Sequence, residues 1–326
     1  MSDVAPVLLA ASVVAAAAPI LLASLGETLT ERAGLINLSL DGAILLSAMA
    51  AFAVAHDTGS LWLGFAAAAA VGGLVAALVG FAGAVLGISQ VAVGFVLTLM
   101  CRDLAYFLGN AYSRIQGPQV PPLPVPLLER IPVLGDLLFR HNAVVYLSLA
   151  LVPAAWWFLY RTRWGLEVRA VGEHPEAAYA RGIHPQRVQM LCAVAGGALV
   201  GLAGAAYSLA LKPGWGRPQG AEGIGWIALA LVIFGGWHPL RVALGAYLFA
   251  LLQVAGIPLQ EVFPSVPAQV FQVAPFPLMI FTLLLMGLSQ REPVERWAAG
   301  RPWARRLVRA LKGSAPRALG RPMAES

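Results

Sequence analysis

Residues 61–86 read LWLGFAAAAAVGGLVAALVGFAGAVL, a stretch in which every residue is apolar or glycine. A helix needs about 20 such residues to cross the hydrocarbon core of a membrane. The apolar residues are continuous and do not alternate with polar ones, which is typical of a membrane helix rather than of a strand in a membrane β-barrel. The stretch therefore predicts a helix that spans a membrane.

The composition of the whole chain supports this prediction. Hydrophobic residues make up 59% of the 326 residues, charged residues only 12%, and the mean hydropathy is +0.75. Soluble globular domains typically carry about 25% charged residues, so this chain has too few ionic side chains to cover a surface in water. We predict an integral membrane protein and exclude a disordered chain, a coiled coil and a basic nucleic-acid-binding domain. Cys101 and Cys192 lie inside apolar runs and indicate no disulfide framework.

Eight further apolar runs accompany the first. Together they predict an all-α, polytopic transmembrane helical bundle of about nine spans, with eight or ten as alternatives. The runs cover 4–25, 40–55, 61–86, 91–109, 143–160, 189–211, 224–234, 240–256 and 270–288. The runs 40–55 and 224–234 are short for a full crossing. Such segments are tilted, re-entrant or broken, which a membrane tolerates only where protein or a water-filled cavity covers the backbone.

The distribution of Lys and Arg predicts the orientation. With nine spans, 16 of the 22 basic residues fall on one side of the membrane and five on the other, and the basic side is the cytoplasmic one. The chain then divides into a membrane domain over 1–290, with the amino terminus outside, and an Arg-rich cytoplasmic tail over 291–326. Within the membrane domain, 161–188 forms a cytoplasmic loop and 110–142 a Pro-rich extracytoplasmic loop. The tail is interpreted either as an amphipathic helix on anionic lipid over 294–312 or as a solvated anchor.

Several kinds of catalytic chemistry have no counterpart in the sequence. It contains no Gly-x-x-x-x-Gly-Lys-[Ser/Thr] loop for ATP, and its five histidines show no metal-ligand spacing. It has neither a Gly-x-Ser-x-Gly nucleophile motif nor a spaced series of carboxylates within the spans of the kind that relays protons. We therefore predict no catalytic residue, cofactor or metal site, and no enzymatic activity of the chain itself.

Residues 26–42, GETLTERAGLINLSLDG, place many polar residues directly before a short span. Glu27 and Glu31 are four residues apart and share a helix face, where Arg32 is positioned to neutralise them. Asn37 allows two interpretations. It caps the start of the next helix, or it lines a passage between two halves of the bundle.

Asn37, Asp41 and Gln90 are the candidates for such a passage. Asp41 lies near the positive end of the next helix, and Gln90 precedes the fourth span. Buried polar groups in a membrane bundle usually face its interior. Arg102 and Asp103 lie within a span, where we expect ion pairs with other helices rather than contact with a solute.

Residues 163–183, RWGLEVRAVGEHPEAAYARGI, predict a short helix on the cytoplasmic face. Pro175 suits the first turn of a helix, and Glu173 and Glu176 lie at the positive end of its dipole. Alanines follow, and Gly182 can end the helix in a left-handed conformation. A short helix whose two ends are marked so closely together is suited to fill a groove in a partner protein.

Three stretches resemble permease subunits of bacterial ABC importers, in the binding-protein-dependent transport family. ERAGLINLSLDG over 31–42 is most similar to the nucleoside and simple-sugar branch. RAVGEHPEAAYARGI over 169–183 resembles the family's cytoplasmic coupling loop, with His174 where Asn is usual. GWIALALVIFGGWHPLRVALGAYLFAL over 225–251 resembles a hairpin of the family. Together these similarities extend over most of 26–288.

The resemblance implies a transporter that works as a complex. Two permease subunits, identical or sister chains, form the pore in the plasma membrane, a separate cytoplasmic ATPase hydrolyses ATP, and an extracytoplasmic lipoprotein delivers the solute. The solute is a nucleoside or a simple sugar. A branched-chain amino acid permease is the nearby alternative, and an ion-coupled secondary transporter is the alternative from another class. The resemblance assigns the ATPase-coupling contact to Gly172, Glu173, Pro175, Ala177, Ala178 and Gly182.

Overall fold

The computed structural model describes residues 4–263, 270, 277, 280, 281, 284, 301 and 315–321. Within this part of the chain the structure is helical and has no β-strand. The α-helices are α1 (Val4–Arg32), α2 (Leu40–Thr58), α3 (Leu61–Ala84), α4 (Gln90–Leu108), α5 (Ala143–Arg161), α6 (Arg163–Glu173), α7 (Pro175–Ala180), α8 (Pro185–Ala206), α9 (Ile224–Phe234) and α10 (Pro239–Val262).

Seven of the described helical segments are long and apolar enough to cross a membrane. They are Pro6–Arg32, Leu40–Thr58, Leu61–Ala84, Gln90–Tyr112, Ala143–Arg161, Pro185–Leu211 and Pro239–Gly256. The predicted polytopic bundle is confirmed, and α9, with 11 residues, is short as expected. The predicted span 270–288 and the predicted amphipathic helix 294–312 lie outside the described residues, apart from the single positions named above.

Four predicted helix ends were wrong by three residues or more. α8 begins at Pro185 rather than at 189, and α10 continues to Val262 rather than ending at 256. The other two are the ends of α1 and α2, where hydropathy falls before the helix stops. α2 does not end at 55 but continues to Thr58, and its 19 residues suffice for a crossing. α1 does not end at 25 but continues to Arg32. The hydroxyls of Thr28 and Thr30 donate to backbone carbonyls four residues earlier, at 2.7 and 3.1 Å, so these polar side chains are satisfied within the helix.

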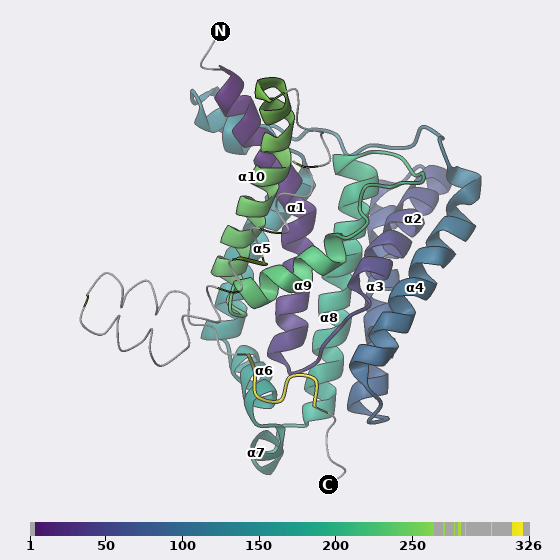
Figure 1. Cartoon of the computed structure of the whole chain (residues 1–326), viewed down its shortest axis with the longest axis vertical. Helices are drawn as coiled ribbons and strands as arrows, with labels where there is room; N and C mark the ends of the chain where they lie inside the picture. Colours follow the sequence, from purple (N-terminus) through teal and green to yellow (C-terminus); the bar gives the residue numbers. More distant parts are fainter. Residues whose placement is uncertain are drawn as a thin grey trace.

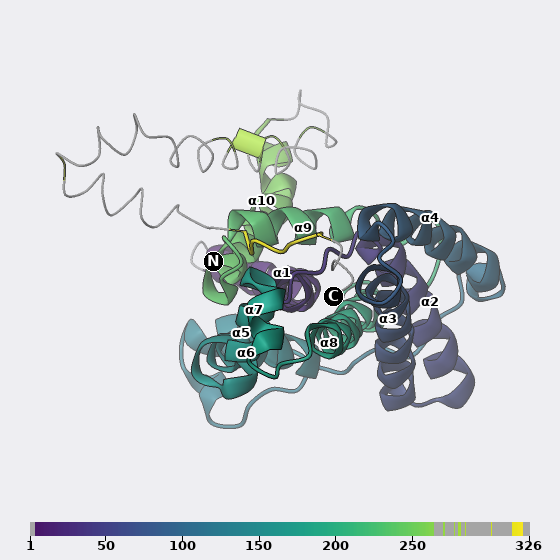
Figure 2. The same cartoon turned by 90° about the horizontal axis from the view of Figure 1, so that it is seen from below.

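The helices form two groups joined by α8 (Figure 1). α2, α3 and α4 lie together on one side of α8, and α1, α5 and α10 on the other, as the view from below also shows (Figure 2). α9 runs obliquely across the long helices, while α6 and α7 extend from the end opposite to the start of α1 (Figure 1). The Pro-rich segment 110–142 contains only short helical turns.

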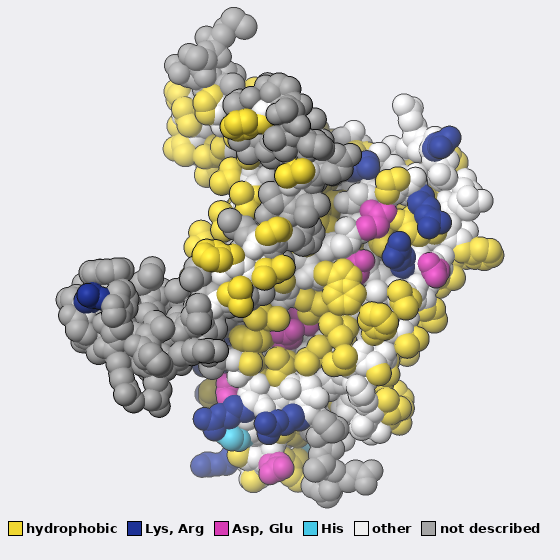
Figure 3. All heavy atoms as spheres, viewed as in Figure 1, with side chains coloured by type: hydrophobic (Ala, Val, Ile, Leu, Met, Phe, Trp, Pro, Cys, Tyr) yellow, Lys and Arg dark blue, Asp and Glu magenta, His cyan; other side chains and the backbone are white. Residues whose placement is uncertain are grey.

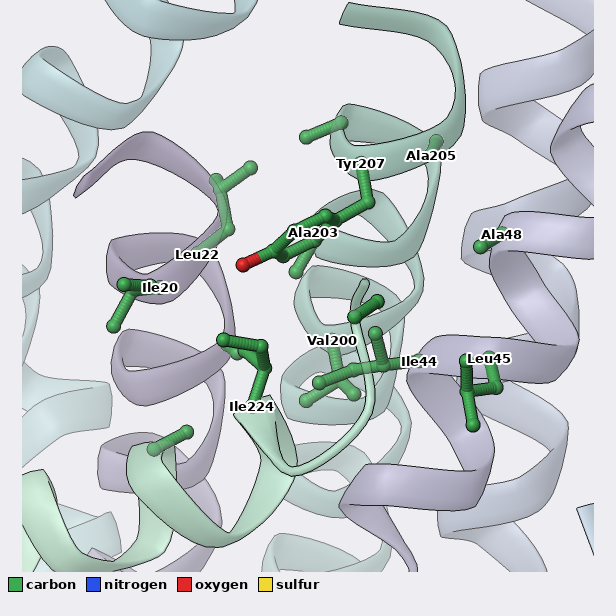
Figure 4. Packing of buried hydrophobic residues seen from close by; sticks show 14 of the residues in the cluster. Ile20, Leu22, Ile44, Leu45, Ala48, Val200, Ala203, Ala205, Tyr207 and Ile224 are labelled. Atoms are coloured by element: carbon green, nitrogen blue, oxygen red, sulfur yellow. The ribbon is translucent and has the colours of Figure 1, made fainter. Parts of the chain in front are cut away.

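The interior between the two groups is filled by apolar side chains. Leu22, Ile44, Val200, Tyr207 and Ile224, from α1, α2, the α8 segment and the start of α9, converge there (Figure 4). α3 and α8 approach so closely that a Cβ atom at the α3 glycine Gly72 would lie 2.6 Å from the backbone nitrogen of Gly201. Small residues at such crossings let membrane helices pack backbone against backbone.

Candidate functional site

The predicted cytoplasmic loop contains two helices rather than one. Thr162 follows α5 and caps α6, because its Oγ1 accepts a hydrogen bond from the Gly165 nitrogen at 3.0 Å. A Cβ atom at Gly165 would lie 2.7 Å from the Leu159 Cα atom, so the chain turns sharply between the two helices. We did not predict α6, whose sequence RWGLEVRAVGE mixes charged and apolar residues and contains two glycines.

α7 is the short helix that Pro175 and Gly182 predict. Pro175 is its first residue, and Gly182 lies beyond its end with φ of +82°, donating its N–H to the Tyr179 carbonyl at 2.8 Å. Ala178 is buried, whereas Ala177 and Tyr179 are exposed. Basic side chains gather at this end of the molecule (Figure 3). α7 thus packs by one face and presents the other outward.

Gly172 brings the end of α6 against the end of α1. A Cβ atom at Gly172 would lie 3.0 Å from the carbonyl carbon of Arg32 and 3.4 Å from the nitrogen of Gly34, and closer still to the Arg32 carbonyl oxygen. Only glycine fits this backbone-to-backbone contact without displacing it. The surface helices are therefore joined directly to the segment that leaves α1.

That segment, residues 33–39, is the buried linker between α1 and α2. Its irregular backbone is hydrogen-bonded by side chains from several helices. The bonds run from Gln189 Nε2 to the Ala33 carbonyl at 3.0 Å, from the Ile36 nitrogen to Gln90 Oε1 at 2.8 Å, from the Asn37 nitrogen to Glu27 Oε1 at 3.2 Å, and from Thr98 Oγ1 to the Leu38 carbonyl at 2.7 Å. Non-helical backbone inside a membrane bundle requires such internal partners.

The three predicted passage residues come together around this linker. Asn37, Asp41 and Gln90 are all buried. Asn37 is not the cap of α2, because Ser39 occupies the cap position. The Oδ1 atom of Asn37 instead accepts hydrogen bonds from the Ser39 nitrogen at 3.1 Å and from its hydroxyl at 2.5 Å. Asn37 thereby shapes the turn that leads into α2.

Asp41 joins the beginnings of two helices. Its Oδ1 atom accepts a hydrogen bond from the nitrogen of Gly225, in the first turn of α9, at 3.1 Å. The two backbones touch there, since a Cβ atom at Gly225 would lie 2.5 Å from the Asp41 Cα atom. A carboxylate is stabilised at helix amino termini by the free N–H groups and the dipole. One side chain therefore anchors both α2 and the short helix α9.

Arg32 does not neutralise the neighbouring glutamates with an ion pair, contrary to the prediction. Its Nε atom donates to the Trp237 carbonyl at 2.7 Å and its Nη2 atom to the Tyr160 hydroxyl at 3.1 Å, while Glu31 accepts a hydrogen bond from the Trp237 indole. His238 stacks on Tyr160 with 5.1 Å between ring centroids. Burial, together with the positive charges of Arg241 and Arg32, lowers the pKa of His238. These contacts fix the α9–α10 turn to the end of α1.

Among the residues that the structure describes, Arg102 and Asp103 have none of the ion-pair partners that we predicted. Both are exposed on α4, and the salt bridge found among the described residues joins Arg140 to Asp136. A charged side chain within a span is costly in lipid and usually faces protein or water. This face of α4 therefore requires a covering other than hydrocarbon.

The loop before α9 is ordered by residues that we did not predict from the sequence. Glu222 accepts a hydrogen bond from Tyr106 on α4 and from the backbone nitrogens of Gln219 and Gly220, the last two at 2.8 and 2.6 Å. Burial alone would raise the pKa of Glu222, but these hydrogen bonds outweigh it and lower the pKa. No motif marks Glu222, because its partner on α4 is distant in sequence.

A comparison with protein families shows to which family this chain belongs. The family model described as "Branched-chain amino acid transport system / permease component" matches residues 9–283. The chain belongs to this permease family. The matched region includes the linker, α6, α7 and the α2–α9 junction, so the whole candidate site lies inside the permease domain. The resemblance stated from the sequence is confirmed, and the chain is a multi-pass membrane permease component.

Relatives of this permease carry names from ABC transport. A putative glucose ABC transporter permease of Haloferax volcanii is 42% identical over 73% of this chain and 74% of the relative. A nucleoside ABC transporter permease of Lactococcus lactis is 31% identical over 83% and 88%, and a guanosine ABC transporter permease of Bacillus subtilis is 30% identical over 82% and 88%. No solved structure matches the permease.

Proposed function

We propose that this chain is the permease subunit of an ABC importer that moves a nucleoside or a simple sugar across the plasma membrane. The observation that carries the proposal is its similarity over 73–83% of its length to permeases named for glucose and nucleosides. The chain has no ATP-binding loop of the Gly-x-x-x-x-Gly-Lys-[Ser/Thr] type. ATP hydrolysis is accordingly assigned to a separate cytoplasmic subunit.

The contact with that ATPase is assigned to α7 and the end of α6. Ala177 faces outward to meet the partner, while Gly172 and Ala178 are buried and attach the helix to the bundle. Glu173 and Pro175 set its start, and Gly182 turns the chain back towards α8. The exposed outer face of a helix held at both ends supports this role.

The backbone contact at Gly172 connects α7 to the helices in the membrane, so that a movement of α7 can be transmitted to them. A displacement of α7 reaches Gly34 through that contact, then the linker, and then Asp41 where α2 and α9 begin. Rigid shifts of packed helices are a common means of switching between two states. Asn37, Asp41 and Gln90 serve the solute passage by holding the linker and the starts of α2 and α9 in place.

The passage itself is assigned to the interface with a second permease subunit. The support is the exposed charge of Arg102 and Asp103 on α4, which a protein surface or a water-filled passage accommodates better than lipid. The second subunit is the same chain or a sister chain. The solute arrives from an extracytoplasmic binding lipoprotein at the end of the bundle where α1 begins.

The proposed orientation places α6, α7 and the Arg-rich tail in the cytoplasm and the amino terminus outside. Two observations support it: 16 of 22 basic residues fall on the assigned inner side, and the start of α1 lies at the opposite end of the molecule from α6 and α7 (Figure 1). Labelling of single cysteines at 57 and 181 in intact cells tests it. A membrane-impermeant maleimide reacts with the first and not with the second.

The function is tested by purifying the tagged permease in a mild detergent and identifying what accompanies it by mass spectrometry. We expect an ATPase with a P-loop, a permease partner and a binding lipoprotein, and a nucleoside or sugar in the lipoprotein. A bound branched-chain amino acid would replace the proposed solute by the alternative one. Recovery of the chain alone, with uptake into vesicles driven by an ion gradient, would overturn the ABC assignment.

A further inference from the structure

The carboxy-terminal segment 315–321 returns to the candidate coupling site. It lies beside α6 and the end of α1, in yellow in Figure 1. The nitrogen of Ala318 donates to the Gly172 carbonyl at 2.9 Å, and the nitrogen of Gly320 donates to the Gly34 carbonyl at 3.1 Å. The segment thus bonds to both members of the backbone contact that joins α6 to the linker.

Buried and exposed residues alternate along the segment. Pro316 and Ala318 are buried, and Ala318 is only 7% exposed. Gly320 has a φ of +70°, and a Cβ atom there would lie 2.6 Å from Ile36 Cδ1 in the linker. Arg317 is exposed, and its Nη1 atom lies 3.3 Å from His174 Nε2. One side of the segment packs inward while the other reaches the start of α7.

The hydrogen bond to Gly172 also completes the end of α6. Gly172 lies in the last turn of this helix, where carbonyl groups have no partner within the helix. Buried backbone groups are satisfied by some other donor. Ala318 provides that donor from more than a hundred residues away, so the geometry of the α6–α7 junction depends on a segment outside the membrane domain.

We propose that the segment 315–321 is a positioning element for coupling. It holds the α6–α7 junction against the linker, so that movement of α7 reaches Gly34. The inference rests on the proposed function of α7 as the ATPase contact. Without the segment, Gly172 still meets Gly34 through packing, but the junction loses its two bridging hydrogen bonds. The bundle itself is held by the contacts of α8 with α1, α2 and α3. We therefore expect loss of coupling without loss of the fold.

The test compares Ala318→Asp with Ala315→Asp in the assembled importer. The substitution is the same, but Ala318 is buried and Ala315 is exposed. A carboxylate placed in a buried site without a partner disfavours docking, and we expect Ala318→Asp to reduce solute-stimulated ATP turnover and uptake by about tenfold. Basal ATP turnover and co-purification of the ATPase stay unchanged. Equal turnover and uptake in the two variants would overturn the proposal.

A second measurement establishes docking independently of turnover. Ala318→Cys and Ala315→Cys are labelled with a maleimide in the assembled complex, against the unmodified chain, whose Cys101 and Cys192 are buried. Because a docked residue reacts only when its segment opens, we expect labelling at 318 to be about tenfold slower than at 315. Equal rates would show an undocked segment and overturn the proposal.

The outcomes separate this inference from the proposed function. If Ala318→Asp has no effect while replacement of Pro175 abolishes solute-stimulated turnover, the positioning role fails and α7 keeps its assignment. If neither replacement changes turnover and the ATPase still co-purifies, α7 is not the coupling contact, and the role of the segment fails with it.

Discussion

α7 and the linker 33–39 are connected through the backbone contact at the end of α6, yet they are built in opposite ways. α7 is a regular helix with an exposed face, and local signals set its ends, Pro175 at the start and Gly182 after the end. The linker is irregular and buried, and side chains from α1, α4 and α8 hold its backbone. A surface helix can be changed with little cost to the bundle, whereas the linker is part of the packing.

This difference predicts that replacements in the two regions separate stability from coupling. Variants of the linker and its contacts lower stability, and variants of α7 lower coupling alone.

Replacement of Gly172 damages both regions at once. A leucine there has no room beside Arg32 and Gly34, and we expect the free energy of unfolding to fall by about 1–3 kcal/mol, the usual cost of overpacking. Thermal unfolding in detergent measures the loss. Ala180→Leu, on the exposed side of α7, is the matched control. A Gly172→Leu variant as stable as this control would contradict the close contact.

Removal of the Asp41 carboxylate acts at the inner end of the linker. Asp41→Ala leaves the buried N–H of Gly225 without its partner, and we expect a destabilisation of about 1–3 kcal/mol. Asp41→Asn keeps an oxygen acceptor in the same place and retains most of the stability. If both variants unfold at the same temperature, the hydrogen bond to α9 does not hold the junction.

A smaller loss is expected from Thr98→Val. Its hydroxyl donates to the Leu38 carbonyl, and loss of this one hydrogen bond costs about 1 kcal/mol. The same substitution at Thr58, whose hydroxyl bonds within its own exposed helix end, is the control. Denaturant unfolding of the two variants side by side measures the difference, and no difference would mean that α4 does not hold the linker.

The variant Glu173→Ala/Pro175→Ala gives the smallest change in stability and the clearest test of coupling. These residues are not in the buried core, so we expect unfolding to change by less than about 0.5 kcal/mol. Membrane insertion is retained, and solute-dependent ATP turnover in the complex is abolished. Glu129→Ala, in the Pro-rich segment at the opposite end, leaves turnover intact. Unchanged turnover in the double variant would remove the coupling assignment.

The sequence predicts the regular parts of this molecule better than the irregular ones. Apolar runs indicate the seven described spans and the short α9, and Pro175 with Gly182 gives α7. The ends of α1 and α2 were misplaced because hydropathy drops where polar residues still continue the helix. α6 was missed because its sequence mixes charged and apolar residues with two glycines, and because the hydrogen bond that completes its last turn comes from Ala318, which no local pattern reveals.

In the candidate site, too, the sequence predicts some features and not others. Asn37, Asp41 and Gln90 are recognisable in the sequence as polar residues in an apolar setting. Their actual partners are the backbone nitrogen and hydroxyl of Ser39 and the backbone nitrogens of Gly225 and Ile36, the last two reached only through folding. Sequence alone selects these three polar side chains and leaves open whether they touch a solute or the backbone.

The shared anchor of α2 and α9 also constrains how the protein is made. Asp41 leaves the ribosome 184 residues before Gly225, an interval of roughly 10–40 s at ordinary rates of synthesis. During that time the first helices are already entering the membrane while Asp41 lacks its partner. The junction between α2 and α9 therefore cannot form until residue 225 has been made. Biogenesis of this permease must keep one acidic group out of lipid until α9 arrives.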